Sequence, residues 1–274
     1  MTVNIPLSAE DRNRASRPLA IVTGASSGIG YELAKKCASH GFDLLIAADE
    51  PELIDAARQL EQFGGQVEAI EVDLSTTEGI DRLLSAVTGR TVDALLANAG
   101  HGLGNAFVDQ DWSQIRHVVD TNITGTVYLL HRVARDMRNR GHGRILITGS
   151  VAGFMPGTYH AVYNATKAFI DMFAYALRAE LHGFGVSVTC LLPGATDTEF
   201  FERADLTDTR LGRQAKADPA EVAESGFNAM MQGESGIITG WQNKLLVALS
   251  RVMPETAVAD RHASTAAPGS GLRR

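Results

Sequence analysis

The sequence of 274 residues is poor in cysteine and has no excess of positive charge. Its two cysteines, Cys37 and Cys190, lie far apart and belong to no CxxC or His-rich cluster, so the sequence indicates neither a disulfide framework nor a zinc site. With 25 Lys and Arg against 32 Asp and Glu, the formal net charge is -7, which gives no general electrostatic reason to bind nucleic acid or an anionic membrane. We therefore expect a small-molecule partner and a reducing, cytoplasmic setting.

The sequence also lacks the apolar segments typical of export signals and membrane spans. Residues 1–17 form a polar N-terminal extension without the continuous apolar core of a signal peptide. The stretch from Ile145 to Thr166 has no formal charge, but it contains glycines, Pro156 and His160, which a lipid-facing helix tolerates poorly. The sequence therefore predicts neither export nor a membrane span.

Apolar residues make up 45% of the chain, enough for a sizeable core. Short apolar runs alternate with longer segments of helical period, and the runs predict strands at 19–23, 43–47, 67–72, 93–97, 144–148, 186–192 and 236–239. Because parallel neighbours need a crossover long enough to hold a helix, the pattern predicts one α/β domain over residues 18–254. We expect a doubly wound parallel sheet of about seven strands with helices on both faces.

Two segments near the C-terminus depart from this pattern. Residues 198–218 carry many charges and little strand pattern, so they form either a mobile lid or an ordinary surface loop with a short helix. Residues 255–274 are rich in Ala, Ser, Thr, Gly and Pro, with few large apolar groups. We expect this tail to be disordered.

A glycine-rich turn follows the first predicted strand and leads directly into a predicted helix. It reads TGASSGIG over residues 23–30 and offers Gly24, Ser26, Ser27, Gly28, Ile29 and Gly30 to a ligand. Free backbone N–H groups and the positive end of the helix dipole meet at such a turn and suit a pyrophosphate. Glycine permits the tight turn and the close approach of the ligand, so the turn predicts a dinucleotide site.

An acidic residue, Asp49, stands nineteen residues beyond Gly30, where the second strand should end. A carboxylate there accepts hydrogen bonds from the adenosine ribose and repels a 2′-phosphate. No Lys or Arg lies between Cys37 and Ala57 to compensate such a phosphate, so the sequence favours NAD over NADP. The alternative is that Asp49 only begins the next helix, where a carboxylate is also favourable.

Tyr163 and Lys167 are spaced i, i+4 on one face of the helix predicted over 159–181. A nearby cation favours the phenolate form and lowers the pKa of the tyrosine toward the range in which it is a useful acid/base. Ser150, at the end of a predicted strand, can hydrogen-bond the same substrate oxygen. Tyr31 and Lys35 repeat the spacing, but no serine stands thirteen residues before Tyr31, so we interpret that pair as structural.

Taken together, these motifs resemble the short-chain dehydrogenase/reductase (SDR) family over residues 18 to about 245. The resemblance includes TGASSGIG, VDLS at 72–75, ANAG at 97–100, TNITG with Asn122, Ser150, YNATK at 163–167 and PGATDT at 193–198. It implies a Rossmann-like fold, an NAD(P) cofactor and a homodimer or homotetramer. In this family the NAD-type aspartate usually ends the strand, which falls here on Ala48, one residue before Asp49.

The resemblance also implies roles for individual residues. Tyr163 is the acid/base, Lys167 lowers its pKa and holds the nicotinamide ribose, Ser150 orients the substrate oxygen, and Asn122 holds a proton-relaying water. The implied cofactor contacts are Asp73 and Leu74 at the adenine, Asn98, Ala99 and Gly100 along the adenosine, and Pro193, Gly194, Thr196 and Thr198 near the nicotinamide. The implied reaction is reversible hydride transfer between nicotinamide and a secondary alcohol or its ketone.

Two other functions remain open. A non-catalytic cofactor-binding or scaffold protein could use the same fold, because fold alone does not establish activity. A nucleotide-sugar epimerase or dehydratase of the extended families is disfavoured, because their usual TGxxGxxG spacing is not found here. No His, Asp and Glu cluster has metal-ligand spacing in the sequence, so we expect no metal.

Overall fold

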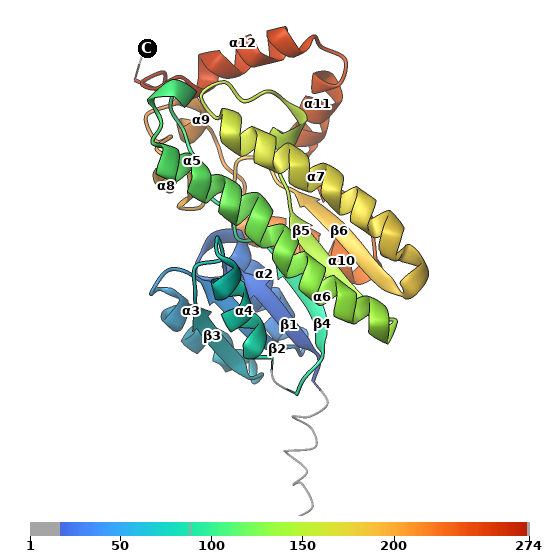
Figure 1. Ribbon diagram of the computed structural model, residues 1–274. Coiled ribbons are helices and arrows are strands. Elements are labelled where there is room, and N and C mark those ends of the chain that lie inside the picture. Colours follow the sequence, from blue (N-terminus) through green and yellow to red (C-terminus); the bar gives the residue numbers. More distant parts are fainter. Residues whose placement is uncertain (1–16, 88, 273–274) are drawn as a thin grey trace, which may run out of the picture.

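The computed structural model describes residues 17–272, except residue 88 (Figure 1). Seven parallel strands form one sheet in the order β3-β2-β1-β4-β5-β6-β7. They are β1 (Leu19–Thr23), β2 (Asp43–Ala48), β3 (Val67–Glu71), β4 (Val92–Ala97), β5 (Gly143–Thr148), β6 (Val186–Leu192) and β7 (Gly236–Ile238). The predicted single sheet is confirmed. Of the predicted N-terminal extension, all but Arg17 lies outside the described residues.

Helices cover both faces of the sheet, as the fold class predicts. Buried side chains of α2 (Gly28–Ser39), α3 (Leu53–Leu60) and α10 (Pro219–Gln232) form one apolar cluster with the strands. Those of α4 (Thr77–Ser85), α6 (Thr126–Arg140) and α7 (Ala161–Leu181) form a second cluster. The sheet therefore lies between two apolar layers, which explains why its inner strands are buried along nearly their whole length.

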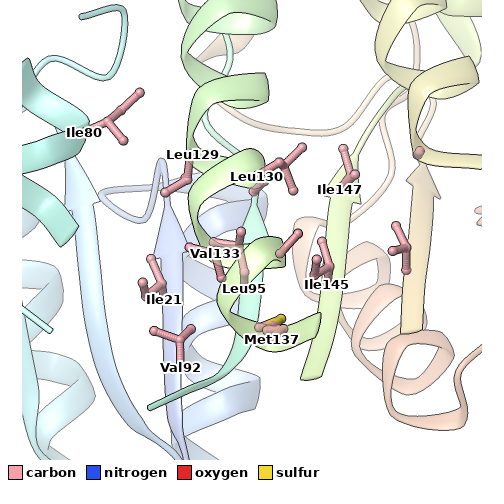
Figure 2. Packing of buried hydrophobic residues seen from close by; sticks show 14 of the residues in the cluster. Ile21, Ile80, Val92, Leu95, Leu129, Leu130, Val133, Met137, Ile145 and Ile147 are labelled. Atoms are coloured by element: carbon pink, nitrogen blue, oxygen red, sulfur yellow. The ribbon is translucent and has the colours of Figure 1, made fainter. Parts of the chain in front are cut away.

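The packing of α6 shows how helical periodicity builds this core. Leu130, Val133 and Met137 recur at the spacing that places them on one helix face. In Figure 2 these side chains point onto the strands, among residues such as Leu95 of β4 and Ile145 of β5. All five are at most 4% exposed, so this contact fixes the position of α6 on the sheet.

The strand order creates a crevice at the carboxyl ends of β1 and β4. The chain builds β1, β2 and β3 toward one edge and then returns to place β4 on the other side of β1. Helices that follow neighbouring strands therefore leave in opposite directions, and ligands of doubly wound sheets bind at this point. The predicted glycine turn follows β1, and ANAG follows β4.

The expectation of a disordered tail is wrong for the described part of residues 255–272. Helix α12 (Glu255–Ala266) forms there, after α11 (Trp241–Ser250), and its Val258 and Ala266 are buried. Thr158 Oγ1 donates to the carbonyl of Ala259 at 2.8 Å. Small residues gave the segment its disorder-like composition, but they also let the helix pack closely, and α12 contacts α9 (Arg210–Arg213).

Residues 198–218 form a connected surface segment that includes α9 and α8 (Phe200–Arg203). Phe201, Ala204 and Leu206 are buried in a small apolar cluster of their own. In Figure 1, α8, α9, α11 and α12 gather beyond one end of the sheet. Among the described residues no helix, including the long α7, has an apolar run sufficient to span a bilayer.

Candidate active site

A cavity of about 610 Å³ crosses the carboxyl ends of the strands. Every cofactor-contact residue named from the sequence lines it: Gly24, Ser26, Ser27, Gly28, Ile29, Gly30, Asp49, Asp73, Leu74, Asn98, Ala99, Gly100, Tyr163, Lys167, Pro193, Gly194, Thr196 and Thr198. Ser150 lines it too, whereas Asn122 does not. The volume lies within the usual range for small-molecule sites.

The glycine turn is held tightly against the loop after β4. Gly24 has φ +64 and Gly28 has φ +57, the left-handed region that favours glycine. The Thr23 hydroxyl accepts the N–H groups of Asn98 and Ala99, each at 3.0 Å. A Cβ on Gly24 would lie 2.9 Å from the Cα of Ala99, so a side chain cannot be added without moving this loop.

The helix that follows the turn presents free donors to the cavity. Ser27 precedes α2 in an extended conformation, and its side chain makes no cap to the helix backbone. The first-turn N–H groups of α2 therefore keep their capacity to bind an anion, strengthened by the helix dipole. The residues present fit a pyrophosphate, because the glycines carry no side chain to obstruct the turn and the positive end of the helix dipole lies at the cavity.

Three side chains meet at the end of the cavity where the sequence predicts the adenosine ribose. Asp49 follows β2, His101 follows β4, and His117 lies on α5 (Trp112–Val119). The Nε2 atom of His101 lies 3.9 Å from Oδ2 of Asp49, and the two imidazole rings lie 4.7 Å apart. Burial, followed by the neighbouring His117, lowers the pKa of His101 and favours its neutral form.

The same three residues form a group able to hold a metal ion, which sequence reasoning missed because they come from three separate segments. Their ligand atoms all lie within 4.8 Å of one another. The 3.9 Å between His101 Nε2 and Asp49 Oδ2 exceeds the roughly 3.3 Å that separates ligand atoms around one tetrahedral zinc. At Asp73, which lines the same cavity, burial tends to raise the pKa of the carboxyl. Hydrogen bonds from Ser75, including its N–H at 2.8 Å, lower that pKa below its usual value overall.

A cation that the sequence does not place here also reaches this end of the cavity. Arg203, on α8, forms ion pairs with Glu50 and Glu199. The Ser26 hydroxyl donates to Glu50, so the glycine turn, the end of β2 and α8 are joined by polar contacts. Packing thus brings a cation from a distant part of the chain to this end of the cavity, where two carboxylates pair with it.

Tyr163, Lys167 and Ser150 meet where β5 and α7 border the cavity. Tyr163 and Lys167 lie one turn apart on α7, and the Lys167 Nζ atom lies 5.8 Å from the centre of the Tyr163 ring. Lys167 donates to the carbonyl of Thr148 at 2.8 Å, which fixes its ammonium at the end of β5. Ser150 begins the short 3₁₀ helix η4 (Val151–Phe154), and its Oγ accepts the Ala152 N–H at 3.1 Å.

Burial dominates the titration of this group. It raises the pKa of the Tyr163 phenol above its usual value, against the effect of the Ser150 hydrogen bond, which lowers it. Burial also lowers the pKa of Lys167, while the nearby Asp171 raises it. Burial is thus the largest effect on the pKa of the Tyr163 phenol, and the lowering by Lys167 that the spacing predicts stays a prediction.

Asn122 lies in a π-helical turn, η3 (Asp120–Gly125), between α5 and α6. Its Oδ1 accepts the His101 N–H at 2.8 Å, and its Nδ2 donates to the His101 carbonyl and to Thr166 Oγ1, each at 2.9 Å. The side chain thus ties the loop after β4 to α7. Irregular π turns often mark functional sites, and this one lies directly behind Gly100 of the cavity wall.

The loop after β6 borders the cavity beside the glycine turn. Thr196 Oγ1 donates to the Gly194 carbonyl at 3.1 Å, and Thr198 accepts the Phe200 N–H at 3.3 Å. A Cβ on Gly28 would lie 2.8 Å from Cγ2 of Thr198. This loop therefore lies directly against the start of α2.

Beyond Tyr163, the cavity has walls that sequence reasoning did not place. His160 stacks on the Tyr163 ring with centroids 4.6 Å apart, and Phe200 lies 5.0 Å from it. Trp241, Leu245, Leu246 and Leu249 of α11 and Val258, Arg261 and His262 of α12 complete this part. Val151, Ala152 and Met155, which follow Ser150, line the cavity as well, whereas Phe154 and Tyr159 do not.

Comparisons with known proteins agree with this geometry. A family model described as short chain dehydrogenase matches residues 18–208. An uncharacterized oxidoreductase of Myxococcus xanthus is 33% identical over 241 residues, covering 86% of this chain and 92% of its own. Human 17-beta-hydroxysteroid dehydrogenase type 1 is 31% identical over 244 residues, covering 78% and 74%.

A solved short-chain dehydrogenase from Sphingobium yanoikuyae, in complex with NADPH, has a TM-score of 0.76 and 28% sequence identity and covers 86% of this chain and 96% of its own. The family match, the dehydrogenase relatives and the shared fold lead to one conclusion. The chain belongs to the short-chain dehydrogenase family, as an NAD(P)-dependent oxidoreductase that acts on CH–OH groups.

Proposed function

We propose that Tyr163 is the acid/base of this oxidoreductase, with Ser150, Lys167 and Asn122 as its partners. The observation that carries the proposal is the meeting of Tyr163, Ser150 and Lys167 on one wall of the cavity, with the Lys167 ammonium anchored to the Thr148 carbonyl at 2.8 Å. A cofactor-binding scaffold on the same fold needs no such arrangement. Tyr31, with the same spacing to Lys35, instead donates to Gln59 on the outer surface.

In the proposed reaction, the chain positions the substrate and moves one proton. The nicotinamide, when bound, supplies the hydride chemistry. Tyr163 takes the proton of the alcohol during oxidation and returns it to the oxygen during reduction, and Ser150 holds that oxygen by a hydrogen bond. The Lys167 ammonium, anchored by Thr148, stabilises the phenolate. Asn122 fixes the loop behind Gly100, and we propose that it also holds the relaying water.

We propose NAD as the preferred cofactor. Asp49 supports this preference because its carboxylate is partly exposed at the end of β2, and Arg203 is already paired with Glu50 and Glu199. In Asp49→Ser, we expect the ratio of kcat/KM for NADP to that for NAD to rise about tenfold or more, as the loss of one charged hydrogen bond implies. Glu52→Gln, an exposed acid three residues later, is the control and should leave the ratio unchanged.

We propose a bulky, largely apolar secondary alcohol or ketone as substrate. The walls beyond Tyr163 are Phe200, Met155 and the leucines of α11, and Trp241, which is 72% exposed, lines the same part of the cavity. Apolar walls with a few polar groups at the reacting end are typical of small-molecule pockets. The human relative, named as a hydroxysteroid dehydrogenase, is consistent with an alcohol on an apolar skeleton.

A deuteride-transfer experiment tests the proposed reaction. The protein is incubated with NADH carrying deuterium at nicotinamide C4 and a panel of bulky ketones, with NADPH in parallel. We expect deuterium on the carbinol carbon of the product, found by mass spectrometry, and the faster reaction with NADH. Tight NADH binding without transfer to any ketone would favour the scaffold alternative.

We also propose a cytoplasmic homodimer or homotetramer. Phe169 and Met172 of α7 are 44% and 61% exposed, an apolar surface that a second copy would cover. The two cysteines are free and buried, consistent with a reducing compartment. Light scattering after size exclusion should give two or four times the chain mass, and Met172→Glu should shift it to the monomer.

A further inference from the structure

A carboxylate that the proposed reaction does not use lies beneath its catalytic groups. Asp171 follows Lys167 by one turn of α7, as Lys167 follows Tyr163, so the three side chains lie in a row on one helix face. Asp171 is 1% exposed. A carboxylate is rarely buried so deeply unless it is paired or functional, because leaving water penalises its charged form.

The strand ends and the loop of Ser150 are shaped around this carboxylate. Its Oδ1 accepts the Ser150 N–H at 3.2 Å and lies 3.9 Å from the Cys190 thiol of β6. A Cβ on Gly149 or Gly153 would overlap the carboxylate oxygens, so only glycine fits at both positions. Its Oδ2 makes no hydrogen bond within the described residues. The carboxylate thus holds the backbone that presents Ser150.

Four titratable groups face Asp171: Tyr163, Lys167 and Tyr175 of α7, and Cys190 of β6. Burial raises the pKa of Asp171 to about 7, and the Lys167 ammonium opposes this effect. In return, the negative charge of Asp171 raises the pKa of Lys167 and of Tyr163. The carboxylate therefore acts on the proton-transfer pair from behind.

We propose that Asp171 is a positioning residue with two separable roles: it anchors the backbone of Ser150, and its charge keeps Lys167 protonated over the working pH range. This inference rests on the proposed function of Tyr163 and Lys167. A buried anion one helical turn beyond Lys167 raises the pKa of Lys167 and so opposes the loss of its proton that burial favours. The anchoring role needs only a hydrogen-bond acceptor, whereas the electrostatic role needs the charge.

Two variants separate these roles. Asp171→Asn removes the charge and keeps an oxygen for the Ser150 N–H, whereas Asp171→Ala removes both. Alcohol oxidation requires a Tyr163 phenolate and a Lys167 ammonium. Its rate therefore rises with pH as Tyr163 loses its proton and falls at higher pH as Lys167 loses its proton. Both limbs of the pH profile should move to lower pH in Asp171→Asn, by about one pH unit, the scale on which a neighbouring charge moves a pKa.

The variants should also differ in rate. Asp171→Ala should show the same shift together with a lower kcat at every pH and an unchanged KM for NAD, because Ser150 loses its anchor. Glu180→Gln, on the exposed C-terminal end of α7, is the control and should leave limbs and kcat unchanged. Limbs that stay in place while kcat falls would mean that Asp171 is only structural and would overturn the electrostatic role.

A second measurement reads Lys167 without turnover. The chain has only five lysines, so ¹³Cε-labelled lysine gives few NMR signals, and Lys167→Arg identifies the one from Lys167. We expect that signal to titrate at lower pH in Asp171→Asn than in wild type and at the wild-type pH in Glu180→Gln. An unchanged titration would overturn the inference, whether or not the enzyme turns over. If only the proposed function is wrong, the protein shows no turnover, but the Lys167 signal still titrates at lower pH in Asp171→Asn.

Discussion

Substitution of Gly30 by alanine tests whether the glycine turn is the pyrophosphate site. A Cβ at this position would overlap the Gly24 carbonyl oxygen and lie 2.6 Å from both the Gly24 carbonyl carbon and Nδ2 of Asn98. Ordinary contact begins at 3.4 Å, so the turn must yield by at least 0.8 Å at these two atoms and by more at the Gly24 oxygen. Such overpacking costs about 1–3 kcal/mol. The higher helix propensity of alanine offsets only about 1 kcal/mol of this cost.

If the turn opens to relieve the overlap, its N–H groups leave the pyrophosphate. A cost of about 1–3 kcal/mol corresponds to a rise of about fivefold to 150-fold in the Kd of NADH, measured by the fluorescence of the bound nicotinamide. Gly183→Ala adds the same methyl group where no atom lies within 4 Å and is the matched control. Equal NADH affinity in Gly30→Ala, Gly183→Ala and wild type would refute the placement of the pyrophosphate.

Three further predictions concern the core, the substrate wall and pH. Leu130→Ala removes a fully buried side chain of α6 and should lower the free energy of unfolding by about 2–5 kcal/mol in denaturant titration; a loss below 1 kcal/mol would contradict the packing in Figure 2. Trp241→Ala should raise KM for a bulky alcohol about tenfold with little change in kcat, and an unchanged KM would remove α11 from the substrate wall. Burial lowers the pKa of His160 to about 3. Between about pH 6.5 and pH 3, His160 therefore binds a proton in the unfolded chain but stays neutral in the folded chain. The stability that neutral His160 contributes is present above about pH 6.5 and is lost toward pH 3; thermal denaturation should therefore show a steeper loss in wild type than in His160→Gln, and parallel curves would contradict the burial of His160.

The sheet and the glycine turn could be predicted because local sequence determines them. Apolar runs such as Leu19–Thr23 have no polar face to expose, and a strand followed by TGASSGIG and a helical run is a continuous stretch of chain. The grouping of Ser150, Tyr163 and Lys167 could be expected from the order of the elements. The single sheet and the family assignment are confirmed, whereas the catalytic roles stay predictions.

The remaining features depend on how distant segments pack. Arg203 reaches Glu50, and His101 meets His117, only because helices α8 and α5 lie at the end of the sheet where the loops after β2 and β4 emerge. The composition of the tail predicts disorder, but composition does not show whether a helix such as α12 finds a surface on which to pack. The raised pKa of Tyr163 likewise depends on burial, which the spacing to Lys167 does not report.

The most direct test of the proposed chemistry is the turnover of Tyr163→Phe, measured together with its affinity for NADH. The variant loses one hydroxyl and keeps the aromatic contacts with His160 and Phe200. Tyr31→Phe, which loses a hydroxyl on the outer surface, is the control. The proposed mechanism predicts near-complete loss of turnover in Tyr163→Phe, NADH affinity within about threefold of wild type, and full activity in Tyr31→Phe. Wild-type turnover in Tyr163→Phe would contradict the assignment of the acid/base.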